Sequence, residues 1–302
     1  MNDSGTIAVV AHDAGGAEIL ASYASRENLR CRFALEGPAV KVFKRKFGDI
    51  ETCSLEEAIS ESDWCLCGTS WQSDLEWDAI GLAKRKEKRV VSFLDHWVNY
   101  RERFSRKGIQ RLPDEIWVGD PDAENLVREC FPGLPIVLVP NPHFLDIKQQ
   151  VTALGIEKAK GEGKGKTVLF VSENISDHAR LRHGNERYWG YTEFDAIEYL
   201  IRNLDTLGGP IERMVIRPHP SDPDGKYDFI VDANQGVIRL GGKETLLEEI
   251  AKADIITGCE SMALVVGLLA GKRVISCIPE GGKPCRLPQK EIEHLGDFKG
   301  VR

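Results

Sequence analysis

The stretch DIITGCESMALVVGLLAGKRVIS, residues 254–276, contains the pattern that decides the fold. A short run rich in β-branched residues (254–259) is followed by an apolar segment of helical length (261–270). A second β-branched run (273–279) comes next. Short apolar runs of this kind indicate buried strands, and strands that alternate with helical segments indicate βαβ units on a parallel sheet. We therefore predict an α/β fold with parallel sheets.

The same alternation extends over the rest of the chain. Further strands are predicted at 7–12, 31–37, 64–68, 89–95, 115–120, 135–141, 167–173, 213–220 and 236–241. Further helices are predicted at 14–26, 55–60, 75–86, 122–130, 192–207 and 245–253. The polar segment 172–190 is predicted to be a loop. Each half of the chain therefore has enough strands for a sheet of its own, which predicts two Rossmann-like domains.

The domain boundary is predicted from a change in composition. The chain has 302 residues, which is long enough for two domains that each bury a core. GIEKAKGEGKGK, residues 155–166, is rich in glycine and lysine and resembles a linker. We predict an N-terminal domain at 1–147, a linker at 148–166 and a C-terminal domain at 167–302, facing each other across a cleft that holds the active site.

Charge and composition exclude several classes of protein. The net charge of −7 argues against nucleic acid as a partner. No signal-peptide pattern and no long apolar run occur, so we expect a cytoplasmic protein with at most peripheral membrane contact. The eight cysteines lie mostly in apolar runs, as reduced buried thiols do. Cys65 and Cys67 form a C-x-C pair without further ligands nearby in the sequence, so no zinc site is predicted.

Polar residues that follow predicted strands are the candidate site residues, because open parallel sheets bind ligands beyond the carboxyl ends of their strands. After the first strand, His12 or Asp13 could act as general base. Gly15 and Gly16 then permit a tight turn and a close approach to the acceptor. The turn is not G-x-G-x-x-G, so the dinucleotide fingerprint is absent. A tight βα turn with a capping aspartate is the alternative interpretation.

SFLDHWVNYRERF, residues 92–104, is a second candidate in the first half. Asp95 is a candidate catalytic residue, and His96 and Trp97 could bind the acceptor, the indole as a stacking wall for a sugar ring. The alternative is a helix-capping aspartate with ordinary aromatic packing. GTSWQSDLEWD, residues 68–78, adds Ser70 as an acceptor contact or a helix cap, with Trp71 and Glu76 as rim contacts.

The sharpest motif of the second half is RPHPSD, residues 217–222. Prolines on both sides hold His219 in a rigid, extended segment at a strand end. Arg217 is a permanent cation suited to a phosphate, and His219 with Pro220 could contact the same ligand. A loop histidine stiffened by prolines is the alternative interpretation.

Two other strand ends could complete a nucleotide site. Ser261 fits the N-cap of a helix whose free N–H groups suit an anion, with Glu260 and Met262 beside it. Capping alone would also explain the serine. Glu173 and Asn174 follow the strand at 167–173 and are candidate phosphate- or nucleotide-binding residues.

These motifs resemble those of a known class of enzymes. R-P-H-P after a strand of the second domain, followed by G-x-E-S, a helix and G-K-x-V-I, resembles the GT-B glycosyltransferases. The histidine-proline pair and the serine motif are similar to those of bacterial sialyltransferases, Kdo transferases and CDP-glycerol-type polymerases. The resemblance implies that His219 and Pro220 contact the nucleotide, that Ser261 and neighbouring amides hold phosphate, and that Glu260 binds ribose. The serine motif here is Glu-Ser where those families have Ser-Ser.

The resemblance implies a glycosyltransferase of bacterial surface polysaccharide synthesis. It would move a sugar from a CMP- or UDP-linked donor, a CMP-activated acidic sugar being one candidate, to a glycan or small hydroxyl acceptor, with His12 or Asp13 as base. We expect no cofactor and no catalytic metal, because the D-x-D of Asp120 and Asp122 looks like a helix cap. The alternatives are a nucleotide-sugar 2-epimerase or hydrolase on the same scaffold, and a two-domain ligand-binding protein of periplasmic type.

Overall fold

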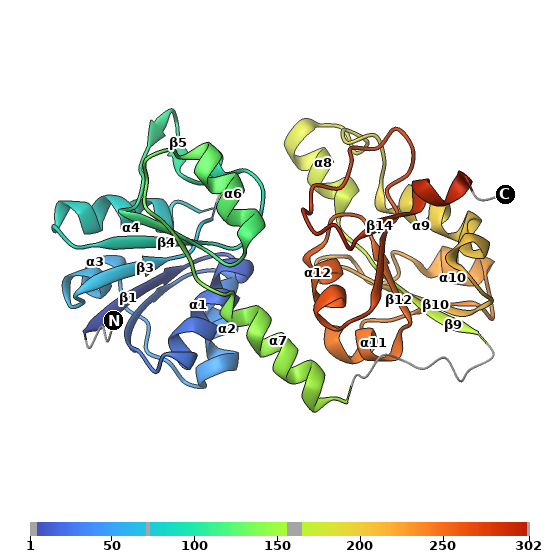
Figure 1. Cartoon of the computed structure of the whole chain (residues 1–302), viewed down its shortest axis with the longest axis horizontal. Coiled ribbons are helices and arrows are strands. Elements are labelled where there is room, and N and C mark those ends of the chain that lie inside the picture. The colour runs from blue at the N-terminus through green and yellow to red at the C-terminus, as the bar shows by residue number, and fades with distance from the viewer. Residues whose placement is uncertain (1–4, 71–72, 156–164, 301–302) are drawn as a thin grey trace. The chain divides into compact units, whose positions relative to one another are not determined.

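The computed structural model describes residues 5–70, 73–155 and 165–300. The chain divides into two compact units, Met1–Asp146 and Ile147–Arg302 (Figure 1). Each unit contains one six-stranded sheet, in which all paired strands are parallel. The predicted α/β class with one parallel sheet in each half is therefore confirmed.

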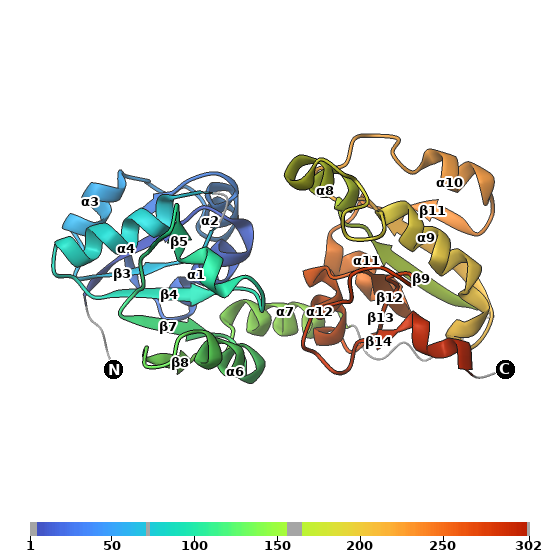
Figure 2. The ribbon, with the colours of Figure 1, turned by 90° about the horizontal axis from the view of Figure 1, so that it is seen from above.

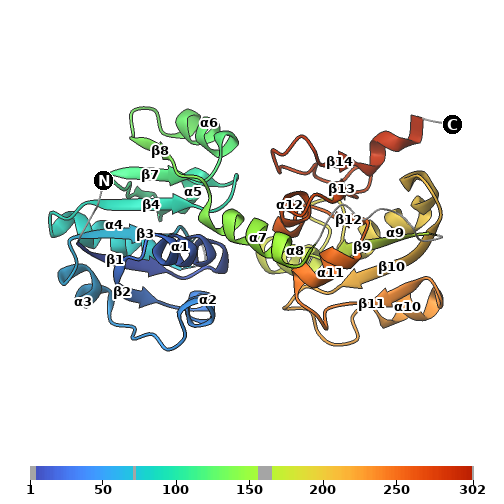
Figure 3. The same ribbon diagram turned by 60° about the horizontal axis from the view of Figure 1, so that its bottom comes forward.

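The first sheet has the strand order β2-β1-β3-β4-β7-β8, which can be followed in Figure 3. Its strands are β1 (Thr6–Ala11), β2 (Arg30–Leu35), β3 (Trp64–Cys67), β4 (Val90–Leu94), β7 (Glu115–Val118) and β8 (Ile136–Leu138). The order reverses between β1 and β3, because the chain adds β2 on one side of β1 and all later strands on the other. Ligands of open α/β sheets bind at such a switch point, beyond the strand ends.

Helices cover this sheet in pairs: α1 packs against α2, and α3 lies beside α4 (Figure 2). The helices are α1 (Ala14–Arg26), α2 (Pro38–Phe47), α3 (Leu55–Ser60), α4 (Leu75–Arg85), α5 (Tyr100–Arg103) and α6 (Pro121–Cys130); α7 (Pro142–Ala153) includes the boundary between the two units. A short hairpin of β5 (Ser105–Arg106) and β6 (Ile109–Gln110) follows α5. The central strands β1, β3, β4 and β7 are short and mostly buried, and Val9, Leu66 and Phe93 lie in one core cluster.

The second sheet has the order β11-β10-β9-β12-β13-β14, which is the 3-2-1-4-5-6 order of a Rossmann fold. Its strands are β9 (Lys166–Val171), β10 (Ile211–Arg217), β11 (Ile238–Leu240), β12 (Ile255–Gly258), β13 (Arg273–Ser276) and β14 (Glu293–His294). The helices are α8 (Ile175–His183), α9 (Glu193–Arg202), α10 (Asp228–Ala233), α11 (Leu246–Lys252), α12 (Met262–Leu269) and the 3₁₀ helices η1 (Leu204–Leu207) and η2 (Leu295–Gly300). Here the order reverses between β9 and β12, so the switch point lies at their carboxyl ends.

The structure corrects the sequence analysis at several elements. The segment 172–190, predicted as a loop, contains α8. This helix buries only Ile175, Ser176 and Ala179, so it lacks the apolar stripe that signals a helix in a sequence. Helices α2, α5, α7 and α10 were also not predicted. The predicted linker, 148–166, includes the end of α7 and the first residue of β9, and its residues 156–164 lie outside the described part of the chain.

Candidate functional site

Two glycines shape the switch point of the first sheet. A Cβ atom at Gly16 would lie 3.4 Å from the Cα atom of Gly68, so the turns after β1 and β3 approach each other closely. A Cβ atom at Gly15 would collide with Oδ2 of Asp95. Glycine at both positions therefore lets three strand ends meet, and the close approach seen here is by the protein's own turns, whereas the predicted contact with an acceptor stays a prediction.

His12 and Asp13, the predicted base candidates, form one unit. Nδ1 of His12 lies 2.8 Å from Oδ1 of Asp13, and the two side chains are 21% and 23% exposed. An ionised carboxylate only accepts hydrogen bonds, so Nδ1 carries the proton and Nε2 has the lone pair. In this arrangement Asp13 holds the imidazole in place, and Nε2 is the ring nitrogen with the lone pair.

A buried glutamate supports the same turn. Oε1 of Glu76 accepts a hydrogen bond of 2.8 Å from the backbone N–H of His12. Glu76 is only 3% exposed, and burial raises the pKa of its carboxyl group to about 7. Its second oxygen is buried and has no hydrogen-bond partner among the described residues. The predicted rim contact is therefore wrong for Glu76, because the side chain points into the protein; Trp71 lies outside the described residues.

Asp95, a predicted catalytic residue, is held by a cation that the sequence analysis did not single out. Its Oδ1 lies 2.7 Å from Nη1 of Arg103, and the two side chains are 13% and 7% exposed. The same nitrogen donates to the carbonyl oxygen and the hydroxyl of Thr69 at 2.8 and 2.9 Å. Asp95 and Arg103 therefore join the ends of β3 and β4 and fix the carboxylate beside Gly15.

The predicted acceptor contacts in this unit are mostly internal. Trp97 is 6% exposed and its indole N–H donates to Asp120 at 3.0 Å, so it is a core residue and not the predicted exposed stacking wall. Ser70 is 1% exposed and its hydroxyl accepts a hydrogen bond of 3.1 Å from the N–H of Ser73. His96 is half-buried, and its Nδ1 accepts the N–H of Trp97 at 2.9 Å.

In the second unit the predicted nucleotide residues follow three adjacent strands. Glu173 and Asn174 follow β9, His219 follows β10 and Ser261 follows β12, and these strands lie in the order β10-β9-β12. Parallel strands present their carboxyl ends at one edge of the sheet, so the topology brings the four residues to that edge.

Glu173 spans the switch point of the second sheet. Its Oε1 accepts hydrogen bonds from the backbone N–H groups of Glu260 at 2.7 Å and Cys259 at 3.1 Å. Burial of the carboxyl group raises its pKa to about 7. The amide of Glu260, a neighbour of Ser261 and thus one of the amides offered to a phosphate, is therefore bound to the protein's own carboxyl group.

Ser261 begins α12 as predicted. Its hydroxyl accepts a hydrogen bond of 3.1 Å from the N–H of Ala263, and Met262 is the first helical residue. Glu260, the predicted ribose ligand, instead pairs with Arg286, whose Nε and Nη2 lie 3.0 and 2.6 Å from its Oε1. The start of α12 thus carries a neutralised glutamate beside the positive end of the helix dipole.

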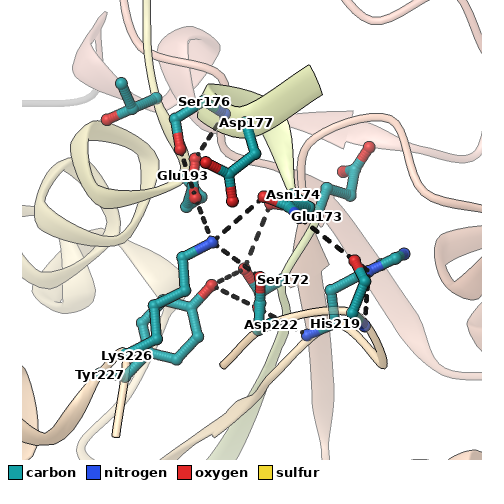
Figure 4. A network of polar contacts seen from close by, with 12 residues as sticks. Ser172, Glu173, Asn174, Ser176, Asp177, Glu193, His219, Asp222, Lys226 and Tyr227 are labelled. Atoms are coloured by element: carbon teal, nitrogen blue, oxygen red, sulfur yellow. Dashed lines mark hydrogen bonds and ion pairs between the residues drawn. The ribbon is translucent and has the colours of Figure 1, made fainter. Parts of the chain in front are cut away.

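His219 is held by its own loop and by the loop after β9 (Figure 4). Its Nδ1 lies 2.7 Å from Oγ of Ser221 and 3.2 Å from the backbone nitrogen of that residue. Nδ2 of Asn174 donates to the same Oγ at 3.1 Å. The backbone N–H of His219 donates to Asp222 at 2.8 Å. The rigid histidine predicted from the flanking prolines is thus also fixed by side chains.

A buried ionic cluster, formed by Lys226, Glu193 and Asp222, lies next to these residues (Figure 4). The Lys226 side chain is 9% exposed and both carboxylates are fully buried. Burial alone would lower the pKa of Lys226. The hydrogen bonds to Asp222 and Glu193 have the larger combined effect, so the pKa is raised. The backbone N–H of Ser176 donates to the other oxygen of Glu193, Oε2, at 2.9 Å, and the hydroxyl of Tyr227 donates to Oδ2 of Asp222 at 2.9 Å. Sequence analysis missed this cluster, because Glu193 is far along the chain from Asp222 and Lys226.

The remaining predicted residues occupy the border of this site. Nη1 of Arg217 lies 2.6 Å from Glu249 and 2.9 Å from the carbonyl oxygen of Glu244, so part of the guanidinium is already bound. Pro220 is exposed. Among the described residues, no group of three or more His, Cys, Asp and Glu side chains is placed to hold a metal ion. No helix in that part of the chain is both long and apolar enough to span a bilayer.

Comparisons with solved structures identify the fold. UDP-GlcNAc 2-epimerase from Methanocaldococcus jannaschii matches 90% of this chain and 83% of its own, with a TM-score of 0.58 and 12% identity. The UDP complex of S. aureus MnaA gives a TM-score of 0.59 at 12% identity, over 90% of this chain and 79% of that one. Acinetobacter baumannii MurG gives a TM-score of 0.53 at 12% identity, over 91% of this chain and 79% of its own. The fold is of the GT-B type. No family model matches the sequence, and no curated protein matches it.

Proposed function

We propose that this protein is a glycosyltransferase that moves a sugar from a nucleotide donor to a hydroxyl group of an acceptor. The observation that carries the proposal is the line of polar groups at the carboxyl ends of β10, β9 and β12, where His219, Glu173 and Ser261 are held in place. This edge includes the switch point of a Rossmann-type sheet, the place where such sheets bind nucleotides.

The second unit would bind the nucleotide of the donor. His219 and the positive end of the α12 dipole would hold the phosphates, since helix starts favour anions. The MnaA structure of the same fold contains UDP, which supports a nucleotide ligand at this scaffold. The donor class that follows is a UDP- or CMP-linked sugar, with a glycan or a small hydroxyl compound as acceptor.

The first unit would supply the base. Nε2 of His12, unprotonated because Nδ1 donates to Asp13, takes the proton of the acceptor hydroxyl. The hydroxyl oxygen then forms a bond to the anomeric carbon, and the bond from that carbon to the phosphate oxygen breaks. The negative charge passes to the leaving nucleotide, where His219 and the dipole of α12 stabilise it.

A nucleotide-sugar 2-epimerase or hydrolase is the second candidate. The specific observation that favours it is Glu173, whose carboxyl group has a pKa raised to about 7 by burial at the switch point. A carboxyl group that titrates near neutrality can both take and return a proton at a sugar carbon. An epimerase or hydrolase needs no acceptor, so the two candidates differ in what they require for turnover.

Two measurements test the proposal. Melting temperatures with UDP, CMP, CDP and GDP should rise for at least one uridine or cytidine nucleotide, because a ligand that binds only the folded state stabilises it. His219→Ala should abolish the rise, whereas His294→Gln, an exposed histidine in the same unit, should keep it. Nucleotide release from a sugar donor is then followed with and without acceptors. Release only with an acceptor supports the transferase; a C2 epimer or free sugar without one supports the alternative, and no shift with any nucleotide contradicts both.

A further inference from the structure

His219 lies at the predicted ligand edge with one ring nitrogen already engaged, and its chemistry depends on which nitrogen carries the proton. We propose that Lys226 fixes the direction of a hydrogen-bond chain through Asn174 and Ser221, so that His219 presents its Nε2–H to the ligand as a donor. Lys226 is in this view a positioning residue for His219.

The chain starts at a group that can only donate. The ammonium of Lys226 has three N–H bonds and no acceptor, and it contacts Glu193 and, at 2.7 Å, Asp222. Its third neighbour is Oδ1 of Asn174 at 3.4 Å. Because the lysine must donate, the amide atom that faces it must be the oxygen. The orientation of the Asn174 amide is therefore set by the cation.

The next two links follow from that orientation. With its oxygen toward Lys226, Asn174 turns its NH₂ group toward Oγ of Ser221 at 3.1 Å and donates to it. The hydroxyl oxygen of Ser221 is then an acceptor on this side and directs its own proton elsewhere. Nδ1 of His219 lies 2.7 Å away and receives it.

A second donor strengthens the same assignment. The backbone N–H of Ser221 also points to Nδ1 of His219, at 3.2 Å. This longer contact favours the same tautomer, because a backbone N–H cannot reverse its role, but the shorter contact with the Ser221 hydroxyl is the stronger of the two and decides it. In a neutral imidazole the proton then resides on Nε2. None of the described residues accepts a hydrogen bond from Nε2, so this proton is available to a ligand.

The surrounding charges favour the neutral ring. Burial lowers the pKa of His219, and charge at His178 and Lys226 acts in the same direction, while Asp222 opposes them. Asp222 is occupied: its oxygens accept from the backbone N–H of His219, from Tyr227 and from Lys226. The ligand group that His219 recognises is consequently a hydrogen-bond acceptor such as a phosphate oxygen. His219 is therefore not the base of the reaction, and its tautomer is opposite to that of His12.

The inference rests on the proposed function only for the identity of the ligand, because the tautomer belongs to the free protein. Two-bond ¹H–¹⁵N correlation spectra of the full chain distinguish the tautomers, and His219→Gln assigns the ring signals. Wild type should show the Nε2–H form. In Asn174→Asp the side chain cannot donate to Ser221, whose hydroxyl turns to the new carboxylate. The Nδ1–H form should then predominate, and the pKa of His219 should rise by about one unit.

Control variants separate this effect from added charge and from misfolding. Asn185→Asp adds the same charge to the same unit at an exposed residue, and it should leave the His219 signals unchanged. Ser221→Ala removes the hydroxyl link without adding charge and should increase the Nδ1–H population. Lys226→Met leaves two buried carboxylates without their cation and is expected to destabilise the fold, so Asn174→Asp and Ser221→Ala carry the test.

The outcomes are distinguishable from those of the proposed function. An Nδ1–H tautomer in wild type, or an unchanged tautomer in Asn174→Asp, overturns the inference. If the tautomers behave as expected and UDP and CMP bind, Asn174→Asp should weaken binding of the better nucleotide about tenfold. If the tautomers behave as expected but no nucleotide binds, the inference holds and the proposed function is overturned.

Discussion

The side chain of Glu76 accepts a hydrogen bond of 2.8 Å from the backbone N–H of His12, across the switch point of the first sheet. Glu173 repeats this arrangement in the second sheet, where it accepts the N–H of Glu260 at 2.7 Å. Burial raises the pKa of both carboxyl groups to about 7. In each unit, therefore, a glutamate with a shifted pKa holds the turn that bears the candidate site residues.

The pKa of Glu76 makes stability fall as the pH rises. The group titrates near 4.5 when unperturbed and about 7 when folded, so between these values the folded state binds more protons than the unfolded state. The unfolding free energy should therefore decrease from about pH 4.5 to pH 7 and level off above it. The full shift corresponds to about 3 kcal/mol for this buried group.

Glu76→Gln should remove the contribution of Glu76 and leave that of Glu173, because the amide keeps an oxygen for the N–H of His12 and does not titrate. Urea unfolding from pH 4.5 to 8 should show the variant gaining stability relative to wild type as the pH rises. Glu129→Gln, at an exposed residue of α6, is the control and should track wild type. A constant difference between Glu76→Gln and wild type over this range would contradict the assignment.

Removing the cation of the buried cluster should be costly. Lys226→Met leaves Glu193 and Asp222 buried without a positive partner, for which a loss of about 3–5 kcal/mol is expected. Lys252→Met breaks an ion pair with Glu244 at the surface, where the lysine side chain is 66% exposed, and should cost less than about 1 kcal/mol. Denaturant unfolding of both variants measures the contrast. Equal losses would show that the buried cluster contributes no more than a surface pair.

Local patterns in the sequence predicted what depends on neighbours along the chain. Helix α1 spans Ala14–Arg26, as predicted, because a strand, a glycine turn and an apolar periodicity follow one another there. The rigid backbone around His219 could likewise be predicted from its two flanking prolines. The ion pair of Lys226 with Glu193 could not be predicted, because the two residues are 33 positions apart and come together only where α9 meets the loop before α10. Partners such as Arg103 for Asp95 depend on the tertiary fold in the same way.

Replacing Gly15 by alanine has two opposing effects on stability. Gly15 is the second residue of α1, where alanine normally improves helix stability by about 0.5–1 kcal/mol. A methyl group there collides with Asp95, so we expect Gly15→Ala to destabilise the protein by about 1–3 kcal/mol instead. Unfolding of Gly15→Ala, Asp95→Ala and the double variant measures the coupling. The double variant should be more stable than the sum of the single losses predicts; strict additivity would show that the collision is relieved elsewhere.

The proposed base gives the last prediction. Asp13→Asn replaces the acceptor-only carboxylate beside Nδ1 of His12 by an amide that can also donate, so the base nitrogen can acquire the proton. The turnover number of this variant for acceptor-dependent nucleotide release should fall by about 10²-fold or more. The turnover number of His12→Gln should fall at least as far. The melting-temperature rise with nucleotide should persist in both variants, because the nucleotide is assigned to the second unit. Loss of that rise would assign His12 to nucleotide binding, whereas full turnover in His12→Gln would exclude it as the base.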